Sequence, residues 1–146
     1  MMKNDNYDRV RMLSFADLGD ERGSLIVVEG AQQVPFEIKR VFYMYGSDAD
    51  VVRGQHANRR TEFVLINVAG QSKVRVDDGC GREEVFSLDK PNTGIYIPRM
   101  VWKCTTFRRT ACFWSWPAST TTAANTCGTT KASKRPSQSR TKRNKG

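Results

Sequence analysis

Apolar residues between positions 24 and 102 come in short runs that are separated by residues typical of turns. The run 62–68 ends at Gly70, and the run 72–76 leads into Asp77-Asp78-Gly79, where glycine can adopt the positive φ angle of a hairpin turn. Residues 82–88 alternate between apolar and polar side chains, as a half-buried strand does. The pattern predicts strands at 24–29, 38–45, 62–68, 72–76, 82–88 and 94–102.

The spacing of these predicted strands indicates the fold class. They recur roughly every ten residues, and no segment of helical periodicity separates them, which argues against a sheet built from βαβ units. A chain of 146 residues is long enough for one domain with a hydrophobic core. We therefore predict a single all-β domain, most simply a jelly-roll barrel.

The strand pattern breaks off after Lys103. Residues 1–103 hold 15 Lys and Arg against 15 Asp and Glu, whereas residues 104–146 hold 9 Lys and Arg, 15 Ser and Thr, and no acidic residue. The whole net charge of +9 therefore belongs to the C-terminal segment. We divide the chain into a domain at 1–103 and a basic, Ser/Thr-rich tail at 104–146.

Two hypotheses explain this tail. It is either a disordered basic segment, or the product of a shift of reading frame near Lys103. A shifted frame permits an apolar, strand-like stretch followed by an acidic, tyrosine-rich segment. Under both hypotheses the barrel is incomplete or irregular at its C-terminus. Residues 104–116 could still supply a substitute strand, because they contain Phe107, Phe113, Trp114 and Trp116.

Composition excludes several classes of protein. No apolar run reaches the roughly 18 residues of a membrane span, and the N-terminus lacks the apolar core of a signal peptide, so we expect a cytoplasmic protein that does not bind membranes. Nucleic-acid binding through the tail is disfavoured, because the domain itself is neutral. The cysteines form no Cys-x-x-Cys pair, so neither a zinc site nor a disulfide is expected; they are Cys80, Cys104, Cys112 and Cys127.

The only histidine of the chain, His56, lies in the segment RGQHANRR at 53–60. It could be a catalyst, a metal ligand or a solvated loop residue. An imidazole has an ordinary pKa of about 6.5, which suits it to accept and donate protons at neutral pH. One histidine and one nearby carboxylate, Glu62, make a poor site for a transition metal, so we expect no metal.

Several segments, in this order, resemble the cupin-fold dTDP-sugar 3,4-ketoisomerases, the WxcM-like domain group. They are D-x-RGSL at 20–25, PFEIKRVFYMY at 35–45, RGQHANRR at 53–60, EFVLINVAG at 62–70, VRVDDG at 74–79 and GIYIPRMVWK at 94–103. The shifted frame after Lys103 also resembles the usual ending of the family.

The resemblance implies a cupin-type jelly-roll barrel that isomerises a dTDP-linked 4-keto-6-deoxyhexose to its 3-keto form, without metal or cofactor. It also implies a homodimer, often with an exchanged N-terminal strand, and a place in the synthesis of surface polysaccharides. The family pattern has His-x-His where this chain has His56 and Asn58. A catalytically weak or silent nucleotide-sugar-binding protein is therefore the alternative.

The chemistry of ketone migration assigns roles to these residues. A base must remove the proton next to the carbonyl and return one to the neighbouring carbon, and His56 is the candidate shuttle. Tyr43 is the candidate second acid, and Asn58 can donate a hydrogen bond to the enediolate. Arginine forks match phosphate geometry. The candidate substrate-binding residues are Arg53, Arg40, Arg22, Glu62, Tyr96 and Trp102.

Overall fold

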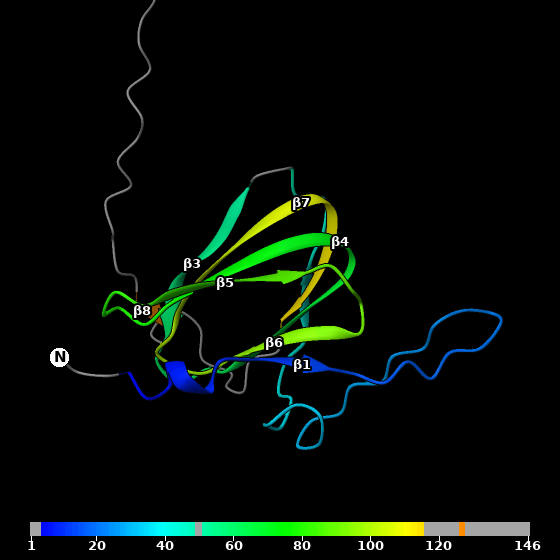
Figure 1. The fold of residues 1–146 in the computed structure, drawn as a ribbon, viewed down its shortest axis with the longest axis horizontal. Coiled ribbons are helices and arrows are strands. Elements are labelled where there is room, and N and C mark those ends of the chain that lie inside the picture. Colours follow the sequence, from blue (N-terminus) through cyan, green and yellow to red (C-terminus); the bar gives the residue numbers. More distant parts are fainter. Residues whose placement is uncertain (1–3, 49–50, 116–125, 128–146) are drawn as a thin grey trace, which may run out of the picture.

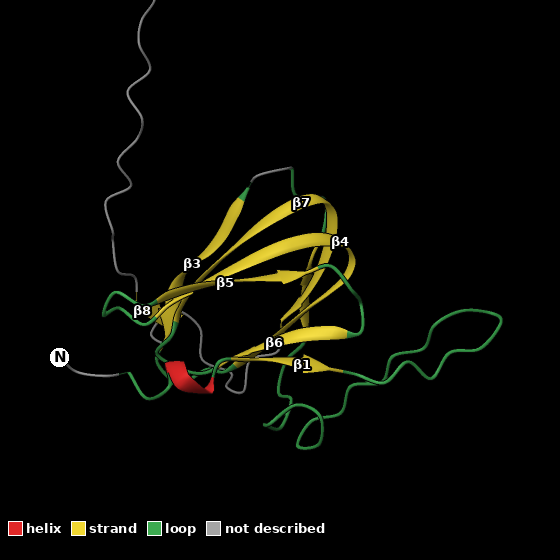
Figure 2. Cartoon of the chain, viewed as in Figure 1, coloured by secondary structure: helices red, strands yellow, loops and turns green. Residues whose placement is uncertain are grey.

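The computed structural model describes residues 4–48, 51–115 and 126–127, and its regular secondary structure consists almost entirely of strands joined by loops (Figures 1 and 2). A single 3-10 turn, η1 (Tyr7–Arg9), precedes the first strand. The strands of the described residues are β1 (Arg11–Ser14), β2 (Phe42–Met44), β3 (Val52–Asn58), β4 (Phe63–Asp77), β5 (Glu83–Leu88), β6 (Thr93–Ile97), β7 (Trp102–Ser115) and β8 (Thr126–Cys127).

The strands form one antiparallel sheet, whose order is β1-β6-β4-β7-β3-β8. The long strand β4 organises the sheet, because its first part pairs with β6, its last part pairs with β5, and β7 follows its other edge. The register of β4 with β7 shifts around Ala69, and Gly70 has a φ angle of 75°. These irregularities permit the strong curvature of both strands in Figure 1.

Hydrophobic residues pack on both faces of this sheet. Side chains of a strand alternate between faces, so Phe63 and Leu65 of β4 contribute to one cluster, while Val64 and Ile66 contribute to another. The inner cluster consists of Tyr7, Phe63, Leu65, Val74, Val76, Leu88, Ile95, Ile97, Val101 and Phe107. The outer cluster consists of Phe15, Val34, Phe36, Val64, Ile66 and Tyr96. Burial of both faces explains why residues 63–66 are apolar without alternation.

The all-β prediction is confirmed, with differences in detail. The sheet curves as a barrel would, but among the described residues it stays open, because β1 and β8 at its two ends do not pair. The predicted strands at 62–68 and 72–76 are two parts of β4. The prediction of a strand at 24–29 is wrong, because this segment forms only an isolated bridge, between Ile26 and Asp17.

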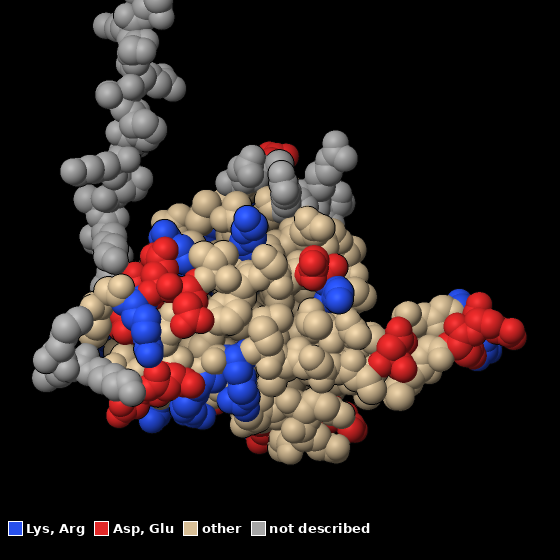
Figure 3. Space-filling view, viewed as in Figure 1, with Lys and Arg blue, Asp and Glu red and all other residues tan. Residues whose placement is uncertain are grey.

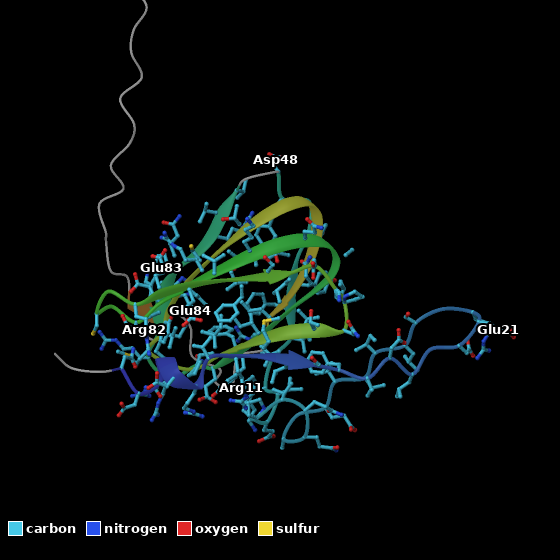
Figure 4. The ribbon with its side chains drawn as sticks, in the orientation of Figure 1. Arg11, Glu21, Asp48, Arg82, Glu83 and Glu84 are labelled. Carbon is cyan, nitrogen blue, oxygen red and sulfur yellow. The ribbon has the colours of Figure 1, made fainter. Side chains whose placement is uncertain are left out.

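The segment around this bridge, residues 17–26, is a narrow hairpin-like projection that we call the arm (Figure 1). It is held by the backbone bond from Leu18 N to Leu25 O and by a second bridge, between Asp20 and Gly23. Acidic and basic side chains gather at its tip (Figure 3), where Glu21 points away from the sheet (Figure 4). The tip of the arm therefore lies apart from both hydrophobic clusters, whereas Ile26 at its base packs against the outer cluster.

Strand β7 runs through the predicted domain boundary at residue 103. It pairs with β3 and β4 on both sides, so the substitute strand expected at 104–116 forms as far as Ser115. Phe107 belongs to the inner cluster and is 1% exposed. Most of the predicted tail, residues 116–125 and 128–146, lies outside the described residues. In the part of the chain that the structure describes, no helix has the length and apolar character of a membrane span.

The burial of Phe107 predicts that residues beyond Lys103 stabilise the fold. Phe107→Ala removes a large side chain from the inner cluster, and we expect it to lower the free energy of unfolding by about 3–5 kcal/mol. Urea denaturation followed by tryptophan fluorescence measures this difference. Val85→Ala on β5 is the control, because Val85 is 56% exposed. Equal midpoints for the two variants would mean that β7 does not contribute to the core.

Candidate active site

Three polar side chains come together where β3 pairs with β7. Residues two apart on a strand share a face, so His56 and Asn58 of β3 lie on the same side of the sheet. Lys103 of β7 is the register partner of His56, and side chains of directly opposite residues are neighbours on one face. We call His56, Asn58 and Lys103 the polar cluster.

Contacts within the polar cluster connect all three residues. Lys103 Nζ donates a hydrogen bond to Asn58 Oδ1 at 2.7 Å, and the Asn58 side chain also hydrogen-bonds with His56. The ammonium group of Lys103 lies 4.1 Å from the centre of the Phe63 ring. Lys103 is 6% exposed and Asn58 is 9% exposed, whereas His56 is half-buried. The cluster thus reaches from the inner hydrophobic cluster toward the surface.

Burial controls the protonation of the two basic groups in this cluster. Removal from water lowers the pKa of Lys103 to about 7, because desolvation penalises the charged amine. The pKa of His56 is also lowered, mainly by burial and secondly by the charge of Lys103, while the hydrogen bond with Asn58 acts in the opposite direction. His56 is therefore suited to accept a proton at neutral pH, and Lys103 can both give and take one.

Two predicted substrate-binding residues, Glu62 and Tyr96, meet each other away from the polar cluster. Tyr96 Oη donates to Glu62 Oε1 at 2.9 Å and accepts from Arg9 Nη2 at 3.0 Å. Burial and the carboxylate raise the pKa of Tyr96 to about 12. Tyr96 packs in the outer cluster, on the opposite face from Phe63 and Lys103. This pair therefore contacts Arg9 of the N-terminal segment and does not lie near His56.

Trp102 also lies apart from the polar cluster. It pairs with Ala57 and Asp77, which places it one residue out of phase with Lys103 and therefore on the other face of β7. Arg75 covers its ring, with Cζ 5.3 Å from the ring centre. Trp102 thus packs beneath an arginine on the outside of the sheet.

The remaining predicted residues are dispersed. Tyr43 is 58% exposed and pairs with position 114 of β7, which is 11 positions along the strand from Lys103. Arg40 is exposed in the segment before β2, and Arg53 is exposed on β3 itself. Arg22 lies in the arm, where it pairs with Asp20. Within this chain, then, Asn58 accompanies His56, but Tyr43 does not.

Lys103 is the residue that the sequence prediction of the site lacked. An alternating pattern in the sequence could have revealed it. Every second residue from 101 to 107 is buried, namely Val101, Lys103, Thr105 and Phe107. A lysine at an inward position of such a pattern indicates a buried amine. In the described part of the chain, no group of three or more His, Cys, Asp or Glu side chains is placed to hold a metal ion.

Comparison with known proteins gives the family. The fold and the polar cluster define a cupin-like sheet protein with a histidine beside a buried lysine. The family profile described as WxcM-like, C-terminal, matches residues 8–117. The chain belongs to this WxcM-like family.

Similar proteins agree with this assignment. A TDP-4-oxo-6-deoxy-alpha-D-glucose-3,4-oxoisomerase from Aneurinibacillus thermoaerophilus is 37% identical over 92 residues, which span 63% of this chain and 66% of that enzyme. The matched part is thus just under two thirds of the relative's length.

Solved structures of sugar ketoisomerases are also similar to this chain. QdtA, a sugar 3,4-ketoisomerase from Thermoanaerobacterium thermosaccharolyticum in complex with TDP, has a TM-score of 0.79 at 27% identity, with 89% of this chain and 91% of QdtA covered. WlaRB, a TDP-quinovose 3,4-ketoisomerase from Campylobacter jejuni, has a TM-score of 0.75 at 34% identity, with 80% and 90% covered. The cupin-type fold that the sequence predicts is thereby confirmed.

The lowered pKa of Lys103 predicts how stability depends on pH. The amine titrates at about 7 in the folded chain and at about 10.4 when unfolded, so between these values the unfolded state binds more protons. The free energy of unfolding is therefore expected to rise from pH 7 to about pH 10. Urea denaturation of the native chain and of Lys103→Met across this range measures the effect.

The variant isolates the contribution of Lys103 to this pH dependence. Lys103→Met keeps the length of the side chain but cannot titrate, so its stability should lack the additional rise. His56 contributes to the pH dependence of stability only at pH values below its ordinary pKa of 6.5, which is outside the range from pH 7 to pH 10. Parallel stability curves for the two proteins would contradict the burial of a titrating amine.

Proposed function

We propose that this protein isomerises a dTDP-linked 4-keto-6-deoxyhexose to the 3-keto form through an enediol. The observation that carries the proposal is the polar cluster, in which a half-buried imidazole with a lowered pKa lies beside two other polar side chains. The similarity to a TDP-4-oxo-6-deoxy-alpha-D-glucose-3,4-oxoisomerase supports this choice of substrate. Proton transfer alone accomplishes the reaction, so it consumes no cofactor.

His56 carries the carbon-bound proton in this proposal. The C3 proton of a 4-keto sugar is acidic because the adjacent carbonyl can accept the electron pair. A neutral imidazole removes it, and the resulting imidazolium returns a proton to C4 from the same side of the ring. The lowered pKa of His56 keeps the resting imidazole neutral at pH 7, which is the form that the first step needs.

Exchange with heavy water tests the function directly. The native chain, incubated with dTDP-4-keto-6-deoxyglucose in D₂O, should form the 3-keto isomer with deuterium on the sugar ring, detected by NMR and mass spectrometry. His56→Gln should lower the rate by about 100-fold or more, because the amide cannot shuttle a proton. Retained dTDP binding by calorimetry with no deuterium uptake in the native chain would favour the silent binding protein instead.

We also propose that the protein works as a homodimer in which the arm packs on a second copy. The arm exposes Leu18 and Leu25, which are 60% and 55% exposed, and such side chains favour burial against a partner. Arg22 on the arm would then approach the second copy, where its guanidinium can meet the diphosphate of the substrate.

On the family resemblance, we place the reaction in the cytoplasm and in the supply of sugars for surface polysaccharides.

Sedimentation velocity tests the dimer. The native chain should sediment as a dimer at micromolar concentration, and Leu18→Asp combined with Leu25→Asp should shift it to a monomer, because charged side chains would have to be buried at the interface. Val85→Asp on β5 is the matched control and should stay dimeric. A monomeric native chain, or a dimeric double variant, would refute this role of the arm.

A further inference from the structure

The proposed isomerisation needs a second proton carrier besides His56. While the imidazole moves hydrogen between two carbons, the C4 oxygen must gain a proton and the C3 oxygen must lose one. Tyr43, the predicted second acid, pairs with β7 at position 114, far along the strand from the partner of His56. Asn58 has an amide, which cannot exchange a proton at neutral pH. The described chain offers another group at the right place.

Lys103 lies beside both residues of the family's His-x-His pattern. It is the register partner of His56, and its Nζ donates to Asn58 Oδ1 at 2.7 Å. Asn58 occupies the position of the second imidazole, so the hydrogen bond brings an amine to the side chain that stands where this imidazole would be. Proximity of a titratable nitrogen to the candidate base is what a second acid requires.

We propose that Lys103 is a second catalytic residue of the isomerase, which protonates the C4 oxygen of the substrate and later accepts the proton of the C3 hydroxyl. The inference rests on the proposed function. In the first half, His56 removes the C3 proton, the electron pair forms the C3–C4 double bond, and the carbonyl oxygen takes a proton from the Lys103 ammonium. The products of this half are the neutral enediol, an imidazolium and a neutral amine.

The second half restores both residues. The neutral Lys103 amine removes the proton of the C3 hydroxyl, the C3 carbonyl forms, and the electron pair of the double bond takes the imidazolium proton at C4. His56 ends neutral and Lys103 ends as an ammonium, as they began. No oxidant, reductant or further reactant enters, so atoms and electrons balance.

The surroundings of Lys103 suit an amine that changes protonation in each cycle. Among the described residues packed around it, β3 contributes the titratable His56 and the neutral Asn58, β4 contributes the apolar Val76 and Phe63, and β7 itself contributes neutral neighbours. Burial lowers the pKa of the amine to about 7, and no carboxylate of the described residues pairs with it to reverse this shift, so its charged and neutral forms are close in free energy near pH 7. A lysine in this state can donate and then accept a proton.

Asn58 acts as a positioning residue in this scheme. Its Oδ1 accepts from Nζ, and its side chain also hydrogen-bonds with His56, so one amide fixes the distance between the two proton carriers. The substitution of an imidazole by an amide is then compatible with turnover, since the lysine supplies the proton exchange that the amide lacks.

Steady-state kinetics of three variants test the role of Lys103. We expect Lys103→Met to lower kcat by about 100-fold or more, with a smaller change in KM. Lys103→Arg should lower kcat similarly, because a guanidinium keeps the charge but does not release its proton. Lys73→Met is the control on the exposed face of β4, and it should keep native kinetics. Native activity in either Lys103 variant would overturn the proposal.

The pH profile provides a readout that a structural role of Lys103 would not move. The native kcat/KM should fall on the alkaline side with an apparent pKa near 7, as the ammonium is lost. Asn58→Asp places a carboxylate at the hydrogen-bond acceptor, so it should stabilise the ammonium and move this alkaline limb to higher pH. An unmoved limb would overturn the coupling of Asn58 to the acid.

Chemical rescue keeps the test decisive if the larger substitutions perturb folding. Lys103→Ala, checked by circular dichroism and by dTDP binding, should regain part of its activity with added methylamine, and its alkaline limb should follow the pKa of the added amine. Absence of rescue in a folded variant would overturn the acid-base role. Borohydride trapping of substrate on Lys103 would also overturn it, because it would indicate an imine instead.

Failure of this inference can be told apart from failure of the proposed function. A native chain that binds dTDP but gives neither product nor deuterium uptake would contradict both the isomerase function and the role of Lys103. A native chain that turns over, with Lys103→Met equally active, removes only the role of Lys103 and leaves the isomerase in place.

Discussion

The antiparallel register between β3 and β7 is the constraint on which the site depends. It pairs His56 with Lys103, and a slip of one residue would send every side chain of one strand to the opposite face. Lys103 would then point outward, and the hydrogen bond to Asn58 would be lost. Because β4 holds β7 from the other side in a register that pairs Val76 with Lys103, the inner cluster and the polar cluster are fixed by the same strand.

Strand β7 therefore contributes more to the fold than its own sequence pattern indicates. Apolar and polar residues do not alternate regularly beyond Phe107, so β7 carries little register information of its own in that part. The information comes from β4, whose residues Leu65, Ile66 and Asn67 are buried and pair with residues 113–115 of β7. A strand with a weak pattern can thus be ordered by a strong neighbour, which is a tertiary effect that periodicity alone does not predict.

The sequence predicts the parts of the fold in which local pattern and final environment agree. Strands β4 and β5 follow from their apolar runs and from the turn at Asp77-Asp78-Gly79, and the pairing of Asp77 with Glu83 confirms that hairpin. The arm was predicted in part as a strand because residues 25–28 are apolar, yet among the described residues this segment pairs with no strand. In the site, His56 and Asn58 come from one sequence motif and could be predicted together. The place of Lys103 beside them depends on the pairing of β3 with β7, and the place of Tyr43 depends on the path of β7, so neither place could be predicted from the sequence.

The buried amine is the feature that stability alone does not explain. An ammonium with one amide hydrogen bond and one aromatic contact gives up much of its hydration, and an apolar side chain of similar length would fill the same space beside Phe63 and Val76 without that penalty. Strongly shifted titratable groups are concentrated at functional sites. A lysine that weakens the fold at neutral pH, and that sits next to the only histidine of the chain, is most simply understood as a group kept for proton transfer.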